Sequence, residues 1–189
     1  MTVAKLALAA TLALALPCAA LAAPPTWVVD KPNSKLTFSS SFSGEAFTGT
    51  FRRWDAQIVF DPKQLAASKV TATIEPSSAS TGDETRDQSL PTADWFDTGK
   101  FPRATFSTTS FKSLGGNRYE AAGTLTVKGI SKPVTLPFSL AITGSDAKMN
   151  GQVTLSRAAF GVGKGQFESA ETVPLNVVIN VALTAHKAP

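Results

Sequence analysis

Apolar residues recur at every second position in the last long segment of the chain. They are Val173, Leu175, Val177, Ile179, Val181 and Leu183. Successive side chains of a β-strand point to opposite faces, so this alternation predicts a strand with one apolar face. At about 3.3 Å per residue, the segment would extend over roughly 35 Å. A strand of this length is expected in a barrel or in a strongly curved sheet.

The same period recurs along most of the chain. The alternating segments are 36–42, 47–51, 58–60, 70–74, 106–112, 119–127, 134–142 and 148–155. Turn-forming sequences such as Leu114-Gly115-Gly116-Asn117 and Thr143-Gly144-Ser145-Asp146 separate neighbouring segments, which predicts hairpins. We therefore predict an all-β fold with roughly eight antiparallel strands closed into a barrel. A β-sandwich is the alternative that the same periodicity permits.

Residues 80–101 break this pattern, because they are polar, acidic and poor in β-branched residues. Asp83 or Thr81 is positioned to cap a short helix running through Arg86 to Leu90, which Pro91 would end. We predict a helix and loop that close one side of the barrel. No repeat or linker divides residues 23–189, so we expect them to form a single domain.

The first 22 residues have the layout of a secretory signal peptide. Lys5 is followed by an apolar run from Leu6 to Leu16 and by the small residues of Ala20-Leu21-Ala22. We expect cleavage after Ala22 and a periplasmic mature protein. The apolar run is shorter than the roughly 20 residues of a membrane-spanning helix, so no stable membrane anchor is predicted. Cys18 follows Pro17 rather than a small residue, which argues against lipidation of this cysteine.

Residue types that carry chemistry are sparse in this sequence. His186, the single histidine, lies three residues from the end, where a frayed surface position is expected. Cleavage after Ala22 would remove the only cysteine, and the carboxylates show no metal-ligand spacing. The formal charge of +4 comes from scattered residues, so no nucleic-acid partner is expected. We predict no catalytic residue, no metal and no cofactor, and we interpret residues 161–165 as a flexible turn.

Aromatic residues are numerous, with twelve Phe and three Trp in 189 residues. Some of them must fill a core. Several positions predicted to face inward are small, which would leave an apolar void able to accept an apolar guest. These positions are Gly49, Ala72, Ala121, Gly123 and Gly151.

An ordered series of short motifs resembles the YceI-like family of lipid- and polyisoprenoid-binding periplasmic proteins. The series covers nearly all of residues 23–189, and its most specific elements are the Asp-Trp-Phe-Asp and Gly-Ile-Ser-Lys-Pro-Val strings. It comprises Trp27-Val28-Val29-Asp30, Ser34, Phe38, Gly49, Phe51, Arg86-Asp87, Leu90, Asp94-Trp95-Phe96-Asp97, Phe101-Pro102, Thr105-Phe106, the run from Gly123 to Val134, Arg157 and Phe160-Gly161-Val162.

The resemblance implies an extended eight-stranded antiparallel lipocalin-like barrel with a short helix and loop insertion. It also implies a binding, carrier or sequestering role for a long apolar lipid: a polyisoprenoid, a quinone tail or a fatty amide. A homodimer and a membrane quinone or cytochrome partner are compatible with it. One rival is an enzyme that acts on a lipid with the acidic loop and Arg157, and the other is a structural module with a filled interior.

For such a site we predict an apolar wall that contacts the lipid tail and polar side chains that bind its head group. The wall residues are Phe38, Phe42, Phe47, Phe51, Phe106, Leu125, Leu136, Val153, Phe160, Val177 and Ile179. The head-group candidates are Arg157, Arg86 and Asp94. For the two arginines, a salt bridge to the acidic loop is the equally weighted alternative. Slippage by one residue would turn the inward set of any strand outward, so the wall depends on the register.

Overall fold

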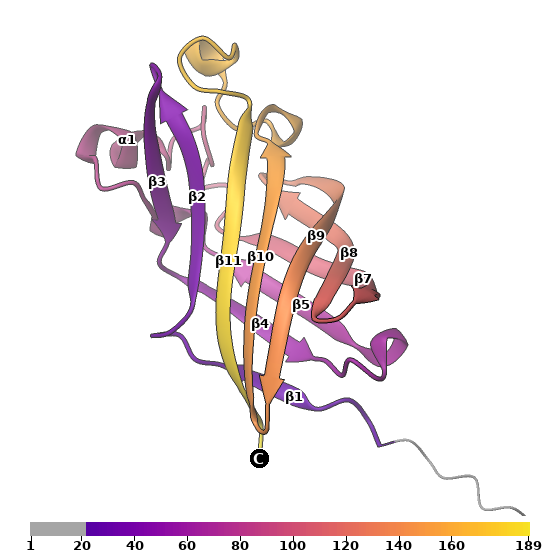
Figure 1. The fold of residues 1–189 in the computed structure, drawn as a ribbon. Coiled ribbons are helices and arrows are strands. Elements are labelled where there is room, and N and C mark those ends of the chain that lie inside the picture. Colours follow the sequence, from indigo (N-terminus) through magenta and orange to yellow (C-terminus); the bar gives the residue numbers. More distant parts are fainter. Residues whose placement is uncertain (1–21) are drawn as a thin grey trace, which may run out of the picture.

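The computed structural model describes residues 22–189 and shows an antiparallel sheet that is rolled into a barrel (Figure 1). Its strands are β1 (Thr26–Val29), β2 (Lys35–Phe42), β3 (Glu45–Phe51), β4 (Trp54–Val59), β5 (Lys69–Ile74), β6 (Ala79–Ser80), β7 (Ala104–Gly115), β8 (Arg118–Val127), β9 (Ile130–Thr143), β10 (Asp146–Ser156) and β11 (Asn176–Lys187). One α-helix, α1 (Glu84–Ser89), and four short 3₁₀ helices complete it. The latter are η1 (Leu65–Ala67), η2 (Pro76–Ser78), η3 (Ala158–Phe160) and η4 (Gly165–Phe167). The predicted signal peptide lies almost wholly outside the described residues.

Eight of these strands close a ring, which confirms the predicted barrel and rules out the β-sandwich. The order around the ring is β1, β4, β5, β7, β8, β9, β10 and β11, and β11 pairs again with β1. The closing contact pairs Val28 with His186, between Trp27–Lys187 and Val29–Ala185. Residues 178–182 of β11 pair with β2 in place of β1. Through this pairing, β2, β3 and β6 extend the sheet beyond the ring. The alternating pattern did not reveal β1, which is too short to show a period.

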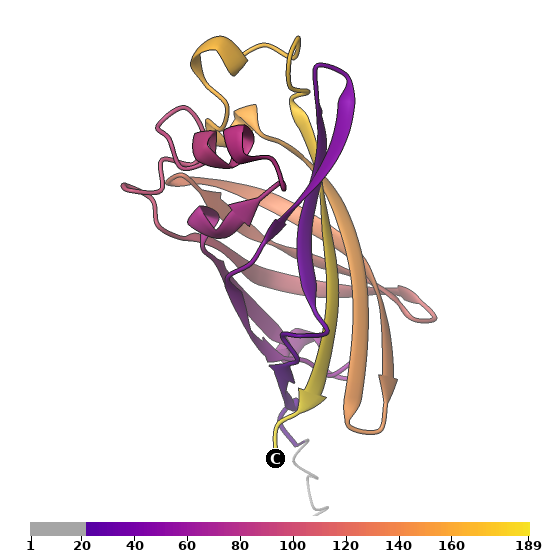
Figure 2. The same cartoon turned by 90° about the vertical axis from the view of Figure 1, so that its left-hand side faces the viewer.

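Helix α1 forms where the sequence predicts it. The Asp83 side chain accepts a hydrogen bond from the backbone nitrogen of Arg86 at 2.9 Å, which satisfies one of the free N–H groups at the helix start. Leu90 follows as the C-cap, and Pro91 begins the next turn. Figure 2 shows α1 and the loop carrying η3 and η4 gathered at one end of the barrel, beside the β2–β3 hairpin. We call this the mouth end, and the opposite end, near the C-terminus, the base.

The base of the barrel is packed by its own side chains. A buried cluster there contains Trp27, Phe60, Tyr119, Ala121, Phe138, Ala147 and Ala185. The Trp27 indole nitrogen donates to the Phe60 carbonyl oxygen at 2.9 Å, so the buried indole has its partner. The Phe60 ring meets Phe111, Tyr119 and Phe138 edge to face. This cluster plugs the barrel where its first and last strands meet.

Two predictions about the last strand need correction. Val173 and Leu175 precede β11, which begins at Asn176, because residues 157–175 form the loop that carries η3 and η4. His186 is not frayed, since it lies inside β11 opposite Val28. Its Nδ1 lies 2.6 Å from an Asp146 carboxylate oxygen, and its Nε2 lies 3.5 Å from an Asp30 carboxylate oxygen. The histidine therefore joins the ends of β1, β10 and β11.

The described residues contain neither a membrane-spanning helix nor a metal-binding cluster. None of the helices formed by residues 22–189 has the length and apolar character needed to cross a bilayer. Within the same residues, no three His, Cys, Asp or Glu side chains come together as a metal ion would require.

Candidate functional site

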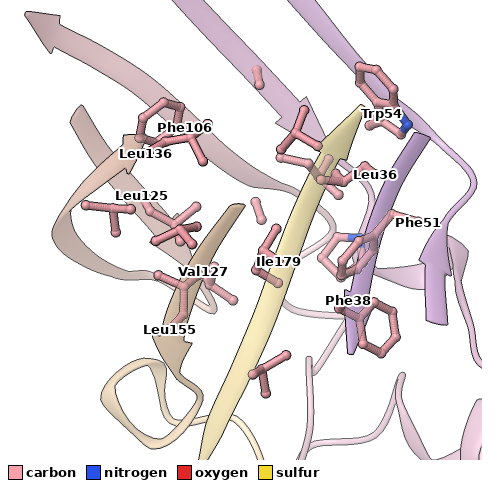
Figure 3. A pocket seen from close by; sticks show the side chains of 18 of the residues that line it. Leu36, Phe38, Phe51, Trp54, Phe106, Leu125, Val127, Leu136, Leu155 and Ile179 are labelled. Carbon is pink, nitrogen blue, oxygen red and sulfur yellow. The ribbon is translucent and has the colours of Figure 1, made fainter. Parts of the chain in front are cut away.

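A cavity of about 780 Å³ runs through the barrel interior. It extends from the base cluster to α1 and the loops at the mouth end, and nearly all of its lining is apolar. Figure 3 shows Phe106, Leu125 and Leu136 on one wall facing Leu36, Phe38 and Phe51 on the other, with Ile179 between them. Phe42 lines the cavity and is 38% exposed, so the cavity reaches the surface beside the tip of the β2–β3 hairpin.

The structure brings all eleven predicted wall residues to this cavity. They are Phe38, Phe42, Phe47, Phe51, Phe106, Leu125, Leu136, Val153, Phe160, Val177 and Ile179. The register explains the result, because Phe38 pairs with Ile179 and Phe106 pairs with Leu125 across neighbouring strands. Directly paired residues lie on the same face of a sheet. Their role as ligand contacts remains a prediction.

The expected source of the void is partly wrong. A Cβ built on Gly49 would collide with the Phe38 ring, and one built on Gly123 would lie 2.8 Å from the Phe106 ring. These glycines therefore accept aromatic rings and do not leave open space, as in the aromatic rescue of glycine in strands. Among the other small residues, Ala72 and Ala121 do line the cavity. A Cβ on Gly151 would lie 3.1–3.2 Å from atoms of Leu136, Pro137 and Phe138, which is closer than ordinary van der Waals contact, so this glycine leaves no open space either.

Arg157 organises the loop that covers the mouth end. The residue is only 5% exposed, and its three guanidinium nitrogens donate to backbone carbonyl oxygens at 2.6–3.1 Å. The acceptors belong to Pro174, Val162, Gly163, Phe167, Ser169 and Val173. Burial lowers the pKa of Arg157, and the carbonyl dipoles take the place of a carboxylate.

This arrangement corrects both expectations for Arg157. Its five N–H groups meet six carbonyl acceptors, so no donor remains for a head group. Within residues 22–189 no carboxylate lies within salt-bridge distance of the guanidinium.

Arg86 lies at the cavity with donors to spare. Its guanidinium stacks 4.7 Å from the centre of the Phe47 ring, and its Nε donates to the Thr81 hydroxyl at 3.3 Å. One terminal nitrogen lies 3.9 Å from an Asp83 carboxylate oxygen, which is a weak ion pair. Because this leaves N–H groups unused, Arg86 is the only one of the three head-group candidates that lines the cavity with free donors.

Asp94 is exposed and does not line the cavity. Its backbone carbonyl oxygen accepts from the nitrogens of Gly163 and Lys164, both at 2.8 Å. Its carboxylate faces Gly165, where a Cβ would lie 3.5 Å from the nearer oxygen. The structure therefore places Asp94 in the contact between two mouth-end loops and outside the cavity lining, a position that does not support the predicted head-group role.

Asp87, in the acidic segment of residues 80–101, uses its carboxylate to stabilise the local structure. Its carboxylate accepts from the Thr81 nitrogen at 2.6 Å, from the Thr81 hydroxyl at 2.7 Å and from the Ser80 hydroxyl at 2.8 Å. Burial raises the pKa of Asp87, but these hydrogen bonds outweigh it and the net pKa is lowered. A carboxylate held ionised in this way anchors α1 to the loop before it and is a poor general acid.

Two polar atoms at the mouth end were missed at the sequence level. The Ser40 hydroxyl and the Trp95 indole nitrogen are buried, and neither has a hydrogen-bond partner within residues 22–189. Both residues line the cavity. Ser40 falls in the same alternating series as Phe38 and Phe42, so the register could have found it, whereas Trp95 lies in a loop that has no period.

The geometry defines a class of protein: a small closed β-barrel that is plugged at one end, with a long apolar cavity opening toward the other. Residues 27–185 match the family described as "YceI-like domain". The chain belongs to the YceI-like family, as its motifs indicated.

Comparison with individual proteins agrees with this assignment. A UPF0312 protein of Pseudomonas syringae pv. tomato is 32% identical over 178 residues, covering 89% of this chain and 92% of the relative. The crystal structure of Burkholderia cenocepacia BcnA is similar with a TM-score of 0.80 at 32% identity, over 83% of this chain and 99% of that one. A polyisoprenoid binding domain from Saccharophagus degradans shares the fold, with a TM-score of 0.67 at 13% identity over 86% and 98% of the two chains.

Proposed function

We propose that this protein binds one long-chain apolar lipid inside the barrel and acts as a carrier or sequestering protein. The observation that carries the proposal is the cavity itself: about 780 Å³, lined by apolar side chains from the base to the mouth end. This volume falls within the range of about 300–1,000 Å³ that small-molecule sites occupy. The name of the Saccharophagus degradans domain, a polyisoprenoid binding domain, supports an isoprenoid as the ligand class.

Partition out of water supplies the binding energy. Each methylene group that leaves water contributes about 0.8 kcal/mol, so a long hydrocarbon tail provides ample driving force before ordering costs are counted. The packed base cluster would hold the far end of the tail, and the polar groups at the mouth end would face the head. The lining that residues 22–189 contribute is almost entirely apolar, which suits a hydrocarbon better than a sugar or a nucleotide.

The compartment and the partners are part of the proposal. Residues 1–22 are proposed to be a cleaved signal peptide that delivers the barrel to the periplasm, because of their charged start, apolar core and small residues. The carrier role implies exchange of lipid with a membrane, for which a quinone or cytochrome system is the proposed recipient. A homodimer is the proposed assembly to be checked by light scattering of the purified protein.

Native mass spectrometry of protein purified from the periplasmic fraction of its own cells tests the proposal. We expect a bound mass with a stoichiometry of one, which is lost on extraction into organic solvent and recovered there as a lipid. Incubation of the emptied protein with that lipid should restore the mass without chemical change. An apo protein that also fails to take up isoprenoids in vitro would overturn the proposal, and turnover of the lipid would point to an enzyme.

A further inference from the structure

Strands β9 and β10 are paired only along the half of their length that lies near the base. The pairing ends at Phe138 and Gly151. Beyond that pair, residues 130–137 of β9 and residues 152–156 of β10 continue toward the mouth end without pairing with each other. Along their other edges the two segments stay paired, with β8 and with β11. Figure 1 shows the two strands side by side near the base and apart above it. We call this unpaired boundary the β9–β10 seam.

Two prolines explain why the pairing stops there. The Leu140 nitrogen donates to the Asn117 carbonyl oxygen at 2.8 Å, so even-numbered residues of β9 direct their N–H groups to β8 and odd-numbered residues direct them to β10. Pro133 and Pro137 are odd-numbered and have no N–H, so β9 lacks these donors on the side of β10. The pairing of both prolines with β8 is unaffected, because that side uses the even-numbered residues. The sequence therefore weakens one edge of β9 and spares the other.

The cavity lies directly behind the seam. The side chains that border the seam on the inside are aliphatic and half-buried, and all of them line the cavity: Val134, Leu136, Val153 and Leu155. Their neighbours on the outside are exposed: Pro133, Thr135, Pro137, Gln152 and Thr154. A hydrocarbon tail that moved through the seam would therefore contact apolar side chains and would separate no paired strands.

The seam is bounded at both of its ends. Near the base, it stops at Phe138 and Gly151, and the Phe138 side chain is buried in the base cluster. At the mouth end, the Lys128 ammonium group donates to the Gly161 carbonyl oxygen at 2.9 Å and to the Ala93 carbonyl oxygen at 2.6 Å. These bonds tie the β8–β9 turn to the loop that carries η3, and η3 packs against β9. With both ends held, separation of the strands would be confined to the segment between them.

We propose that the β9–β10 seam is a lateral gate through which the hydrocarbon tail of the ligand enters and leaves the barrel. The inference rests on the proposed lipid-binding function and specifies how that site exchanges its ligand. Figure 2 shows α1 and the loop with η3 and η4 over the mouth end, so an end-on path takes the tail past these elements. Segments with few main-chain hydrogen bonds open locally at low free energy, which favours the sideways path. Because entry and exit use the same gate, the gate controls both rates and leaves the affinity unchanged.

Cross-linking across the seam tests the gate. Thr135 and Thr154 would face each other if the pairing continued beyond Phe138 and Gly151, and both are exposed. Thr135→Cys and Thr154→Cys are combined with Cys18→Ser, and a short bis-methanethiosulfonate reagent joins the two thiols. Stopped-flow energy transfer to all-trans-retinol from the tryptophans that line the cavity measures uptake and release. We expect the cross-link to slow both rates at least about tenfold, to keep Kd within about twofold, and to lose its effect on reduction.

Thr154→Cys with Val178→Cys is the matched control, because Val178 is the partner of Thr154 in β11, across intact pairing. The same cross-link at that position should change neither rate. Pro137→Thr tests the gate without a cross-link. It restores an N–H that can extend the pairing toward Gln152, so uptake and release should each slow by about two- to fivefold.

Three outcomes would count against these proposals. Unchanged rates in the cross-linked protein would overturn the gate and assign the exchange to the opening beside Phe42, while the lipid-binding function stands. A loss of affinity without slower exchange would overturn the gate as well. Failure of the protein to bind retinol before cross-linking would contradict the proposed function instead.

Discussion

The ring of Phe106 in β7 covers Gly123 in β8, diagonal to its own register partner Leu125. A Cβ at Gly123 would lie 2.8 Å from two atoms of that ring and 2.5 Å from the Ser107 carbonyl oxygen. The backbone atom cannot swing aside as a side chain could. The absence of a side chain at position 123 is therefore a condition for the packing of this wall.

We expect Gly123→Ala to destabilise the barrel by about 1–3 kcal/mol, because the added methyl group forces β7 and β8 apart. Urea unfolding measures the loss. Gly99→Ala is the control, since a Cβ there would meet nothing within 4 Å, and its stability should stay within about 0.5 kcal/mol of wild type. Equal stability of the two variants would contradict the packing described for Phe106.

Replacing Arg157 by Lys should loosen the loop of residues 158–175. A lysine has three donors in place of five, so several of the buried carbonyls would lose their partners at a total cost of at least about 2 kcal/mol. Limited chymotrypsin digestion should then cut near Phe160 or Phe167 well before the wild-type protein is cut. Arg103→Lys, at an exposed position, should leave the digestion pattern unchanged. Slow cleavage of both variants would argue against the role of Arg157 in this loop.

Ala72→Leu adds three carbon atoms to a residue that lines the cavity. We expect affinity for a long isoprenoid to fall about threefold or more, because the tail loses room, while the stability to urea stays within about 1 kcal/mol. Thr71→Leu places the same side chain at the neighbouring position on the other face of β5. That variant should retain lipid affinity. If both variants bind equally well, the tail does not pass Ala72.

The stability of the barrel should depend on pH through His186. Its hydrogen bond with Asp146 raises the pKa of His186 above 6.5, desolvation opposes the rise, and Asp30 adds to it. A raised pKa in the folded state means that the contribution is fully present below pH 6.5 and is lost as the pH rises through the folded pKa. The wild-type protein should therefore exceed His186→Gln in urea midpoint by a margin that becomes smaller as the pH is raised from about 6 to about 9. Asp146→Asn should largely remove this dependence, and a constant difference across the range would contradict it.

Much of the fold could be predicted from the sequence because a strand's side chains alternate. Residues such as Phe38, Phe106 and Ile179 sit on the apolar face of long alternating segments, and they reached the cavity as expected. Ser40 shares that face, yet a wall defined by apolar character leaves it out. The short strand β1 is four residues long and carries too little pattern to be recognised by periodicity.

The mouth end could not be predicted in the same way. Arg157 is held by backbone carbonyl groups from six residues. Every residue has a backbone carbonyl, so the amino-acid sequence does not show which of them will bind an arginine. Asp94 likewise acts mainly through its backbone oxygen. Side-chain type alone therefore suggested ionic roles for two residues whose contacts are with the main chain.

The contact between β1 and β11 has a consequence for the order of folding. Residues 27–29 pair on one side with residues 185–187, at the greatest separation in sequence among the strand pairings of residues 22–189. Loop closure over so many residues is slow, and the circle cannot be completed before the last strand has been synthesised. Until then the apolar interior is exposed to solvent along one side of the barrel. A chaperone or an early-bound lipid would protect the nascent chain most in that state, because either would cover the exposed apolar surface.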